Sequence, residues 1–119
     1  MSSVISQVGD HHQQRLVKRL MDYIEEHYME DPNLSDITQR DLFMHPNRLS
    51  KLLKDMTGSS FSKYLPDVRT KNAVSLIKHR DLSISTIAQL VGYNSESHFV
   101  QVFRRYYGQT PGGYRKELW

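Results

Sequence analysis

The sequence contains no cysteine, which excludes disulfides, thiolate metal ligands and cysteine nucleophiles. It has no apolar run close to the ~20 residues that a membrane-spanning helix requires. Its first residues lack the basic start and the apolar core of a signal peptide. These absences lead us to expect a soluble protein of the cytoplasm with no membrane partner.

Residue patterns typical of enzymes and cofactor sites are missing as well. There is no glycine-rich phosphate loop and no readable Ser/His/Asp array, and the carboxylates of the second half are scattered. The histidines include His11, His12 and His27 on or before one predicted helix, but their spacing matches no zinc motif. We therefore expect no enzymatic activity, no metal and no cofactor.

Positive charge is scarce in the first part of the chain and abundant in the rest. Residues 1–44 contain 4 Lys/Arg and 8 Asp/Glu, a net charge of −4, whereas residues 45–119 contain 12 and 5, a net charge of +7. The two parts sum to the overall charge of +3 at pH 7. Clustered positive charge is typical of a nucleic-acid surface, although a solvated basic face or attraction to an acidic protein would give the same pattern.

The chain of 119 residues suffices for one domain or two very small ones, and its periodicity predicts helices. Residues 1–11 show little periodicity and indicate a flexible leader or linker. From about His12 apolar residues recur at every fourth position. The helix they predict ends before Asp31-Pro32, because the residue before proline avoids helical dihedrals. The recurring residues are Leu16, Leu20, Ile24 and Tyr28.

A stretch at about residues 83–108 has the pattern of a helix-turn-helix. Ser83 can cap a short helix, Gly92 can supply a left-handed turn, and Asn94 or Ser95 can cap a second helix. The apolar residues predicted to face the core are Ile84, Ile87, Ala88, Val91, Phe99, Val102, Phe103 and Tyr106. In a DNA-binding helix-turn-helix the second helix enters the major groove, whereas in an ordinary helical hairpin its outer face is merely solvated.

The same order of features occurs 50 positions earlier, over about residues 34–58, where Gly58 corresponds to Gly108. Its predicted anchors are Ile37, Leu42 and Met44 in a short helix, then Leu49, Leu52, Leu53 and Met56 as the inner stripe of a helix that starts at His45-Pro46. A linker helix at about residues 61–78 joins the two patterns, and Pro66 either marks its true start or kinks it. The prediction is an all-α fold that presents two recognition helices to one duplex, roughly one turn (~34 Å) apart.

At these positions the sequence closely resembles the DNA-binding domain of the AraC/XylS family of bacterial transcription regulators, over about residues 15–116. The most specific matches are Ser83, Ile84, Ser85, Ile87, Ala88, Val91, Gly92, Tyr93, Ser95, Ser97, Phe99, Phe103, Arg104, Arg105, Tyr106, Gly108, Thr110, Pro111, Tyr114 and Arg115. Upstream matches are Tyr23, Ile24, His27, Tyr28, Leu49, Ser50, Leu52, Thr57, Gly58, Ser60, Phe61, Tyr64, Leu65, Arg69 and Ala73.

The resemblance implies a DNA reader of about seven helices over residues 12–119. It implies a transcription regulator, most often an activator that binds double-stranded promoter DNA and recruits RNA polymerase. Family members usually carry a separate effector-binding or dimerisation domain, for which this chain has no room. The chain is then either an excised C-terminal domain, which its linker-like start favours, or a small standalone regulator. Two alternatives stay open: a protein-interaction module that keeps the fold without binding DNA specifically, and the DNA-binding part of a larger effector-responsive or enzyme-fused protein.

The resemblance also assigns side chains to the DNA. The implied base-reading residues are Asn47, Ser50 and Lys51 in the first helix-turn-helix and Glu96, Ser97 and Gln101 in the second. Asn or Gln can pair with adenine, Lys can donate to guanine and Glu can accept from cytosine. The implied DNA-backbone residues are Arg48, Lys54, His98, Arg104 and Arg105. Arg69 either clamps a phosphate or forms an internal pair, and we favour the internal pair.

The first helix-turn-helix departs more from the family pattern than the second. Its departures are at Thr38 or Gln39, at Phe43 in the turn, and in an extra residue between Ile37 and Leu42. Pro66 is unusual in the linker helix, Gln101 stands where Arg is frequent, and Glu96 adds a negative charge near the DNA. We therefore expect the second helix-turn-helix to dominate sequence discrimination.

Overall fold

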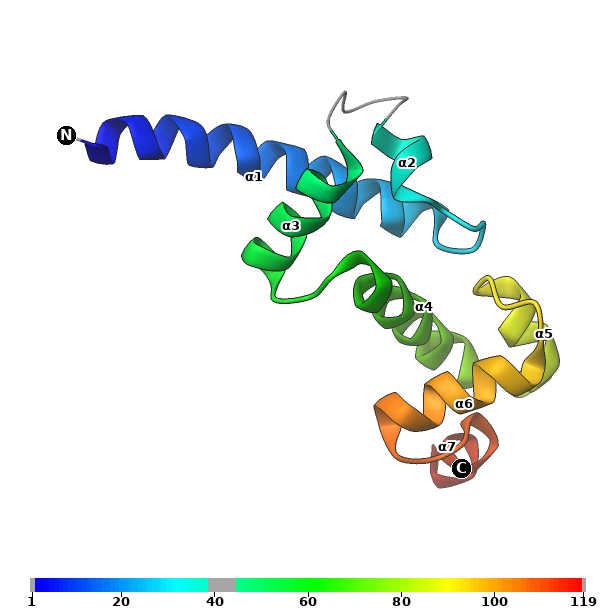
Figure 1. The fold of residues 1–119 in the computed structure, drawn as a ribbon. Helices are drawn as coiled ribbons and strands as arrows, with labels where there is room; N and C mark the ends of the chain where they lie inside the picture. Colours follow the sequence, from blue (N-terminus) through cyan, green and yellow to red (C-terminus); the bar gives the residue numbers. More distant parts are fainter. Residues whose placement is uncertain (1, 39–44, 119) are drawn as a thin grey trace. The chain divides into compact units, whose positions relative to one another are not determined.

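The computed structural model describes the backbone of residues 2–38 and 45–118, and the side chains of those residues from residue 12 onward. The described residues form helices and connecting loops, with no strand (Figure 1). In chain order the helices are α1 (Ser2–His27), α2 (Leu34–Ile37), α3 (Pro46–Thr57), α4 (Phe61–Ile77), α5 (Ile84–Leu90), α6 (Glu96–Tyr107) and α7 (Pro111–Leu118). The predicted all-α fold with its seven helices is confirmed over this part of the chain.

The chain divides into two compact units. The first unit comprises Met1–His27 and Pro32–Tyr64, and the second comprises Tyr28–Asp31 and Leu65–Trp119. The boundary falls inside α4, directly before the Leu65-Pro66 pair. Each unit therefore contains one of the two predicted helix-turn-helix patterns.

Helix α1 begins at Ser2, whereas the sequence led us to expect a helix only from about His12. Residues 2–27 contain no proline, so no residue in this range lacks the backbone N–H that a helix requires. The helix ends at His27, before Asp31-Pro32 as predicted. In the first unit α1 packs on α3, and α2 packs on α3. The buried apolar residues of this unit are Leu16, Val17, Leu20, Ile24, Ile37, Leu49 and Leu53.

The ends of the helices in the first unit follow local capping rules. The Asn33 side chain accepts from the Ser35 N–H (2.8 Å), and the His45 Nδ1 accepts from the Asn47 N–H (3.2 Å) ahead of the proline that starts α3. Gly58 ends α3 with a φ of 81°, in the left-handed region. The predictions for Gln39, Leu42, Phe43 and Met44, and for the extra residue before Leu42, lie outside the described residues.

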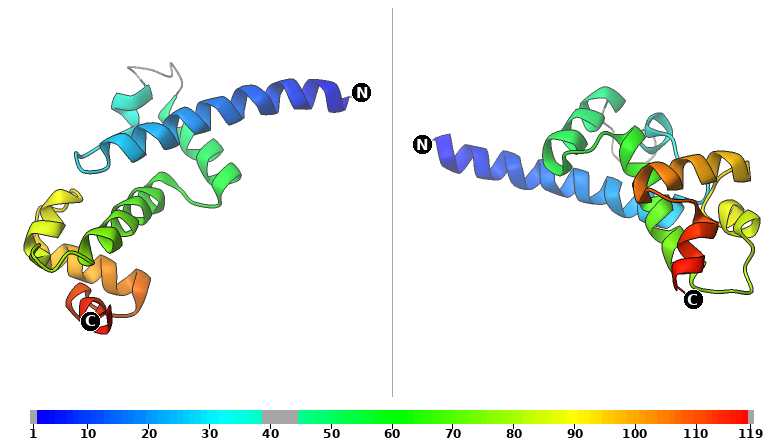
Figure 2. Two further views of the ribbon diagram at one scale, coloured as in Figure 1. Left: turned by 180° about the vertical axis from the view of Figure 1, so that it is seen from behind. Right: turned by 90° about the horizontal axis from the view of Figure 1, so that it is seen from below.

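Helix α4 runs without interruption through Pro66, and the left view of Figure 2 shows it as one helix. The suggestion that the helix truly starts near Leu65 is therefore wrong. Pro66 lies in the second turn and supplies no N–H for the helical ladder. Its own carbonyl accepts a bond from the Thr70 hydroxyl (2.9 Å).

The second unit has a core built from α4, α5 and α6. Its buried residues are Ala73, Ile77, Ile87, Ala88, Val91, Tyr93, Phe99, Val102 and Phe103. Phe99 and Phe103 are fully buried, and their ring centroids lie 5.8 Å apart. The predicted inner stripe of this helix-turn-helix is confirmed at these two positions.

Two residues predicted to face the core are instead exposed. Met56 is 41% exposed and Tyr106 is 37% exposed, so their assignment to an inner stripe is wrong. Each lies in the last turn of its helix, two residues before a capping glycine. The periodicity places them on the correct side of the helix, but the core does not reach that last turn.

Arg69 on α4 holds the segment that follows α1. Its Nε donates to the Tyr28 carbonyl (2.8 Å), and its Nη2 donates to the Glu30 carbonyl (2.9 Å). Carbonyls at the end of a helix lack partners within it, and a guanidinium can satisfy two of them at once. Arg69 is 8% exposed, so we regard this bonding as structural.

Arg115 on α7 makes the same pair of bonds at the end of α4. Its Nε donates to the Ile77 carbonyl (3.0 Å), and its Nη2 donates to the His79 carbonyl (3.0 Å). As with Arg69, the two acceptors are two residues apart and lie at or just after the end of a helix that precedes a helix-turn-helix. The repeat seen in the sequence therefore extends to the residues that close each helix end.

Candidate nucleic-acid interface

Helix α6 has an outer face opposite its buried one. Successive residues of an α-helix are rotated by about 100°, so Ser97, Gln101 and Arg104 share one stripe. This stripe lies opposite the buried Phe99 and Phe103. All three residues of the stripe are exposed. They form an unobstructed polar strip along the helix within the second unit.

The first turn of α6 is well capped. The Ser95 Oγ accepts a hydrogen bond from the His98 N–H (3.1 Å), and the backbone carbonyl of Ser95 accepts from the Phe99 N–H (3.2 Å). Glu96 lies in this turn, where the helix dipole favours a negative charge. A helix-stabilising role thus accompanies its implied contact with cytosine.

Helix α3 carries the corresponding outer stripe in the first unit. Asn47, Lys51 and Lys54 are exposed and lie opposite the buried Leu49 and Leu53. They occupy the same places on α3 that Ser97, Gln101 and Arg104 occupy on α6, 50 positions later. Both helices therefore present the same arrangement of an outer stripe over a buried one.

Two candidates for DNA-backbone contacts lie on the same helix faces as the candidates for base contacts. Lys54 and Arg104, which the resemblance assigns to the DNA backbone, lie seven residues after Asn47 and Ser97 and share their stripes. Ser50 is only partly exposed and lies beside its stripe. The seven-residue spacing was present in the sequence and could have identified this grouping.

Arg48, His98 and Arg105 are exposed on the flanks of the two helices. Helix α3 carries three cations and one carboxylate, a net charge of +2, and α6 carries two and one, a net charge of +1. Within the described part of the chain, Arg48, Lys51, Lys54 and Arg104 form no ion pair with a carboxylate. Their charge is therefore not neutralised by any residue that the structure describes.

Arg69 is held internally and does not belong to this surface. The preference for an internal role is confirmed, but its hydrogen-bond acceptors are the backbone carbonyls of Tyr28 and Glu30, with no carboxylate among them. These acceptors lie 41 and 39 residues away in the sequence, so no local pattern could identify them.

Tyr106 anchors the end of α6 to α4. Burial, and after it a side-chain hydrogen bond to Asp67, raises the pKa of Tyr106 to about 12. The phenol donates to the carboxylate, so the protonated form of Tyr106 is favoured in the folded state. The contact holds the end of α6 against α4.

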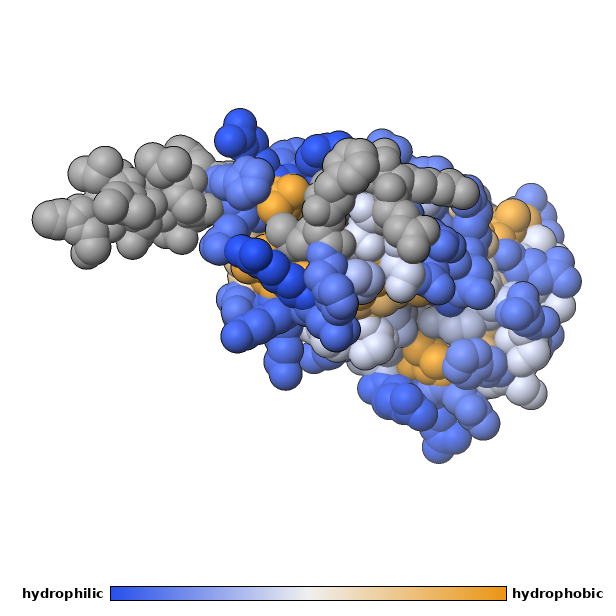
Figure 3. All heavy atoms as spheres, turned by 45° about the horizontal axis from the view of Figure 1, so that its top comes forward, coloured by the Kyte–Doolittle hydropathy of each residue, from blue (hydrophilic) through white to orange (hydrophobic). Residues whose placement is uncertain are grey.

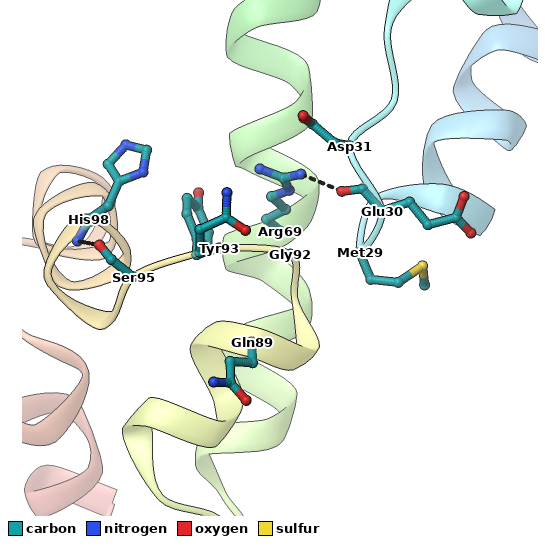
Figure 4. A pocket seen from close by; sticks show the side chains of 10 residues that line it. Met29, Glu30, Asp31, Arg69, Gln89, Gly92, Tyr93, Ser95 and His98 are labelled. Carbon is teal, nitrogen blue, oxygen red and sulfur yellow. Dashed lines mark hydrogen bonds between the residues drawn. The ribbon is translucent and has the colours of Figure 1, made fainter.

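A polar pocket of about 580 Å³ lies beside the start of α6 (Figure 4). It is lined by Met29, Glu30, Asp31, Arg69, Gln89, Gly92, Tyr93, Asn94, Ser95 and His98. No group of three His, Cys, Asp or Glu residues that could hold a metal ion occurs among the residues described. Elsewhere, the face drawn in Figure 3 is mainly hydrophilic, with hydrophobic residues in small separate patches.

Within the described ranges, no helix is both long enough and apolar enough to cross a membrane.

Comparison with known proteins gives consistent matches. A family model described as a helix-turn-helix domain matches residues 39–117. The transcriptional regulatory protein YesN of Bacillus subtilis is 36% identical over 113 residues, which cover 92% of this chain and 30% of YesN. The chain spans about a third of the length of the curated relatives it matches.

Solved structures share the fold. The C-terminal domain of AraT, a response regulator from Geobacillus stearothermophilus, has a TM-score of 0.81 and 31% sequence identity, covering 86% of this chain and 84% of that one. The DNA-binding domain of the global transcriptional factor AdpA, solved with a target DNA, has a TM-score of 0.77 and 24% identity, covering 85% and 90%. The likeness to AdpA shows a common fold.

Proposed function

Because the chain belongs to the AraC/XylS family of transcription regulators and corresponds to its DNA-binding domain, we propose that it reads promoter DNA with two helices. Helix α3 and helix α6 would each enter the major groove of double-stranded DNA. The observation that supports this most is the pair of matching exposed stripes, each opposite a buried apolar one. In this proposal residues 12–119 act as one DNA-binding domain, with the linker helix between two helix-turn-helix subdomains.

The base-reading role falls on the exposed residues of the stripes. In α6 we assign Ser97 and Gln101 to base edges, because a Gln amide can pair bidentately with adenine. In α3 we assign Asn47 and Lys51, with Lys as a donor to guanine. Glu96 lies at the start of its helix, where it could accept from cytosine. Ser50 is half-buried and would make the weakest contribution.

The remaining cations are suited to the DNA backbone. Arg48, His98 and Arg105 flank the stripes and would contact phosphates, which position the helices without reading sequence. Lys54 and Arg104 lie at the far ends of the stripes, where a long side chain reaches either a phosphate or a base. We assign both of them to phosphates, in keeping with the family resemblance.

A wider role follows from the family and from the length of its members. We propose that the protein acts at promoters in the bacterial cytoplasm as an activator that contacts RNA polymerase. We also propose that it works with an effector-binding or dimerisation domain, since the relatives are about three times as long. The proposed role is binding, with no catalytic step and no cofactor.

The salt dependence of DNA binding tests the proposal. Binding to duplex DNA should weaken steeply with salt, because each neutralised phosphate releases counterions. Arg104→Ala or Arg105→Ala should weaken binding to all sequences about equally and lower the salt slope by about one unit per lost phosphate contact.

Lys18→Ala is the matched control, because Lys18 is an exposed cation of α1 that pairs with Asp22 (3.4 Å). That variant should keep the wild-type slope. Binding that is insensitive to salt would favour a protein-interaction module instead. A slope that Lys18→Ala lowers as much as Arg104→Ala does would contradict the assignment of the phosphate contact to α6.

A further inference from the structure

Arg69 does more than close the end of a helix, because it also touches the turn that leads into α6. Its guanidinium carbon lies 5.1 Å from the centroid of the Tyr93 ring, a cation–π distance. A Cβ on Gly92 would lie 2.9 Å from the Arg69 Nε and 2.7 Å from the Tyr28 carbonyl oxygen. The α5–α6 turn therefore packs directly against the Arg69 guanidinium (Figure 4).

The Tyr93 ring, which Arg69 contacts, also packs against the first turn of α6. Its ring centroid lies 5.5 Å from that of Phe99 and 5.2 Å from that of His98, the latter edge-on. Tyr93 is 4% exposed, so its ring is fixed between Arg69 and α6. Its hydroxyl makes no hydrogen bond within the described residues. The contact for which the geometry is recorded is between the Arg69 guanidinium and the Tyr93 ring.

We propose that Arg69, acting through Tyr93, is a positioning residue that sets the start of the recognition helix α6 and thereby sharpens its reading of DNA sequence. The proposal rests on the proposed function of α6 as a base reader. Arg69 itself touches no DNA in this account. Its hydrogen bonds to Tyr28 and Glu30 fix the guanidinium, the guanidinium fixes the Tyr93 ring, and the ring fixes the first turn of α6. A base contact depends on the placement of that turn, since readout requires hydrogen-bond geometry at the base edge.

Arg115 provides a matched control. It makes the same two bonds at the end of α4, but among the described residues no hydrogen bond joins it to the α5–α6 turn. Loss of either arginine removes two charge-assisted bonds and lowers stability. Only the loss of Arg69 should change α6, so comparing Arg69→Met with Arg115→Met separates positioning from general stability.

The first experiment measures amide hydrogen exchange without DNA, well below the melting temperature. In Arg69→Met, exchange of the His98 and Phe99 amides should become on the order of tenfold faster than in Arg115→Met, as expected for the loss of charged hydrogen bonds. Tyr93→Leu should show the same acceleration, and Tyr93→Phe should not, because it keeps the ring. If Arg69→Met does not fold, Arg69→Lys replaces it in the experiment and should show the same faster exchange. A single ammonium cannot reproduce the two fixed hydrogen bonds of the guanidinium.

The second experiment is binding-site selection with wild type and both arginine variants at fixed salt. Arg69→Met should reduce the preference at the base pairs that α6 reads by about tenfold, while Arg115→Met keeps the wild-type preference. Equal effects of the two variants in both experiments, or wild-type exchange and preference in Arg69→Met, would overturn the proposal. A wild type with no base preference would instead show that the proposed function has failed, and with it the effect on sequence reading, whatever the exchange result.

Discussion

Three glycines with positive φ offer a sharp test of the fold, because they differ in their surroundings. Gly58, Gly92 and Gly108 have φ values of 81°, 104° and 73°. A Cβ on Gly58 or Gly108 would meet no atom within 4 Å, whereas one on Gly92 would lie 2.7 Å from the Tyr28 carbonyl oxygen and 2.9 Å from the Arg69 Nε. The same substitution to Ala should therefore have different effects at the three sites.

The loss of stability expected for each variant is the sum of a backbone contribution and, at Gly92, a steric contribution. Placing Ala in the left-handed region costs about 1–2 kcal/mol, which is the whole effect expected for Gly58→Ala and Gly108→Ala. At Gly92 the added methyl must also displace a backbone carbonyl and the guanidinium bonded to it. Loss of one hydrogen bond to a charged group adds about 1.5–3 kcal/mol, so Gly92→Ala should cost roughly 3–5 kcal/mol.

Urea unfolding of the three variants measures this difference. The shift in the urea midpoint, at an unchanged m-value, gives the loss of stability. Gly92→Ala should be the least stable of the three, by about 1.5–3 kcal/mol. A Gly92→Ala variant as stable as Gly108→Ala would show that the turn does not lie against Tyr28 and Arg69, and the reasoning would fail.

The remaining predictions concern the core, the reading of DNA and pH. Phe103→Ala should cost about 3–5 kcal/mol, because the ring is fully buried, and wild-type melting of that variant would show that the helix face is misassigned. In binding-site selection, Gln101→Ala should lose about 1–3 kcal/mol of discrimination at one base pair, and Lys51→Ala should lose less because an ammonium has no fixed fork. If Lys51→Ala relaxes more positions, the second helix-turn-helix is not the dominant reader. The folded pKa of Tyr106, about 12, is raised above its ordinary value of 10.0, so the stability it contributes is complete below pH 10 and is lost as pH rises toward 12. Tyr106→Phe, which cannot bond Asp67, should flatten this alkaline loss in unfolding experiments, and an unchanged alkaline profile would remove Tyr106 as its cause.

Local sequence determined the helices and most of their ends. Capping depends on residues within a few positions, so Ser83, Ser95 and Gly108 could be assigned without tertiary information, and the structure places them at those ends. The buried stripe of α6 is equally local, because a period of 3.6 residues puts Phe99 and Phe103 on one face. The outer stripe is then the opposite face, whereas the assignment of its residues to DNA bases came from the family resemblance and remains a prediction.

Only the tertiary structure decided how far the core extends along each helix. Met56 and Tyr106 have the correct period but are exposed, since the core ends before the last turn of their helices. The acceptors of Arg69 lie 41 and 39 residues away, and the need for glycine at position 92 comes from the Tyr28 carbonyl, which is more distant still in the chain. Periodicity and capping are short-range properties of one helix, whereas these contacts depend on how separate helices pack.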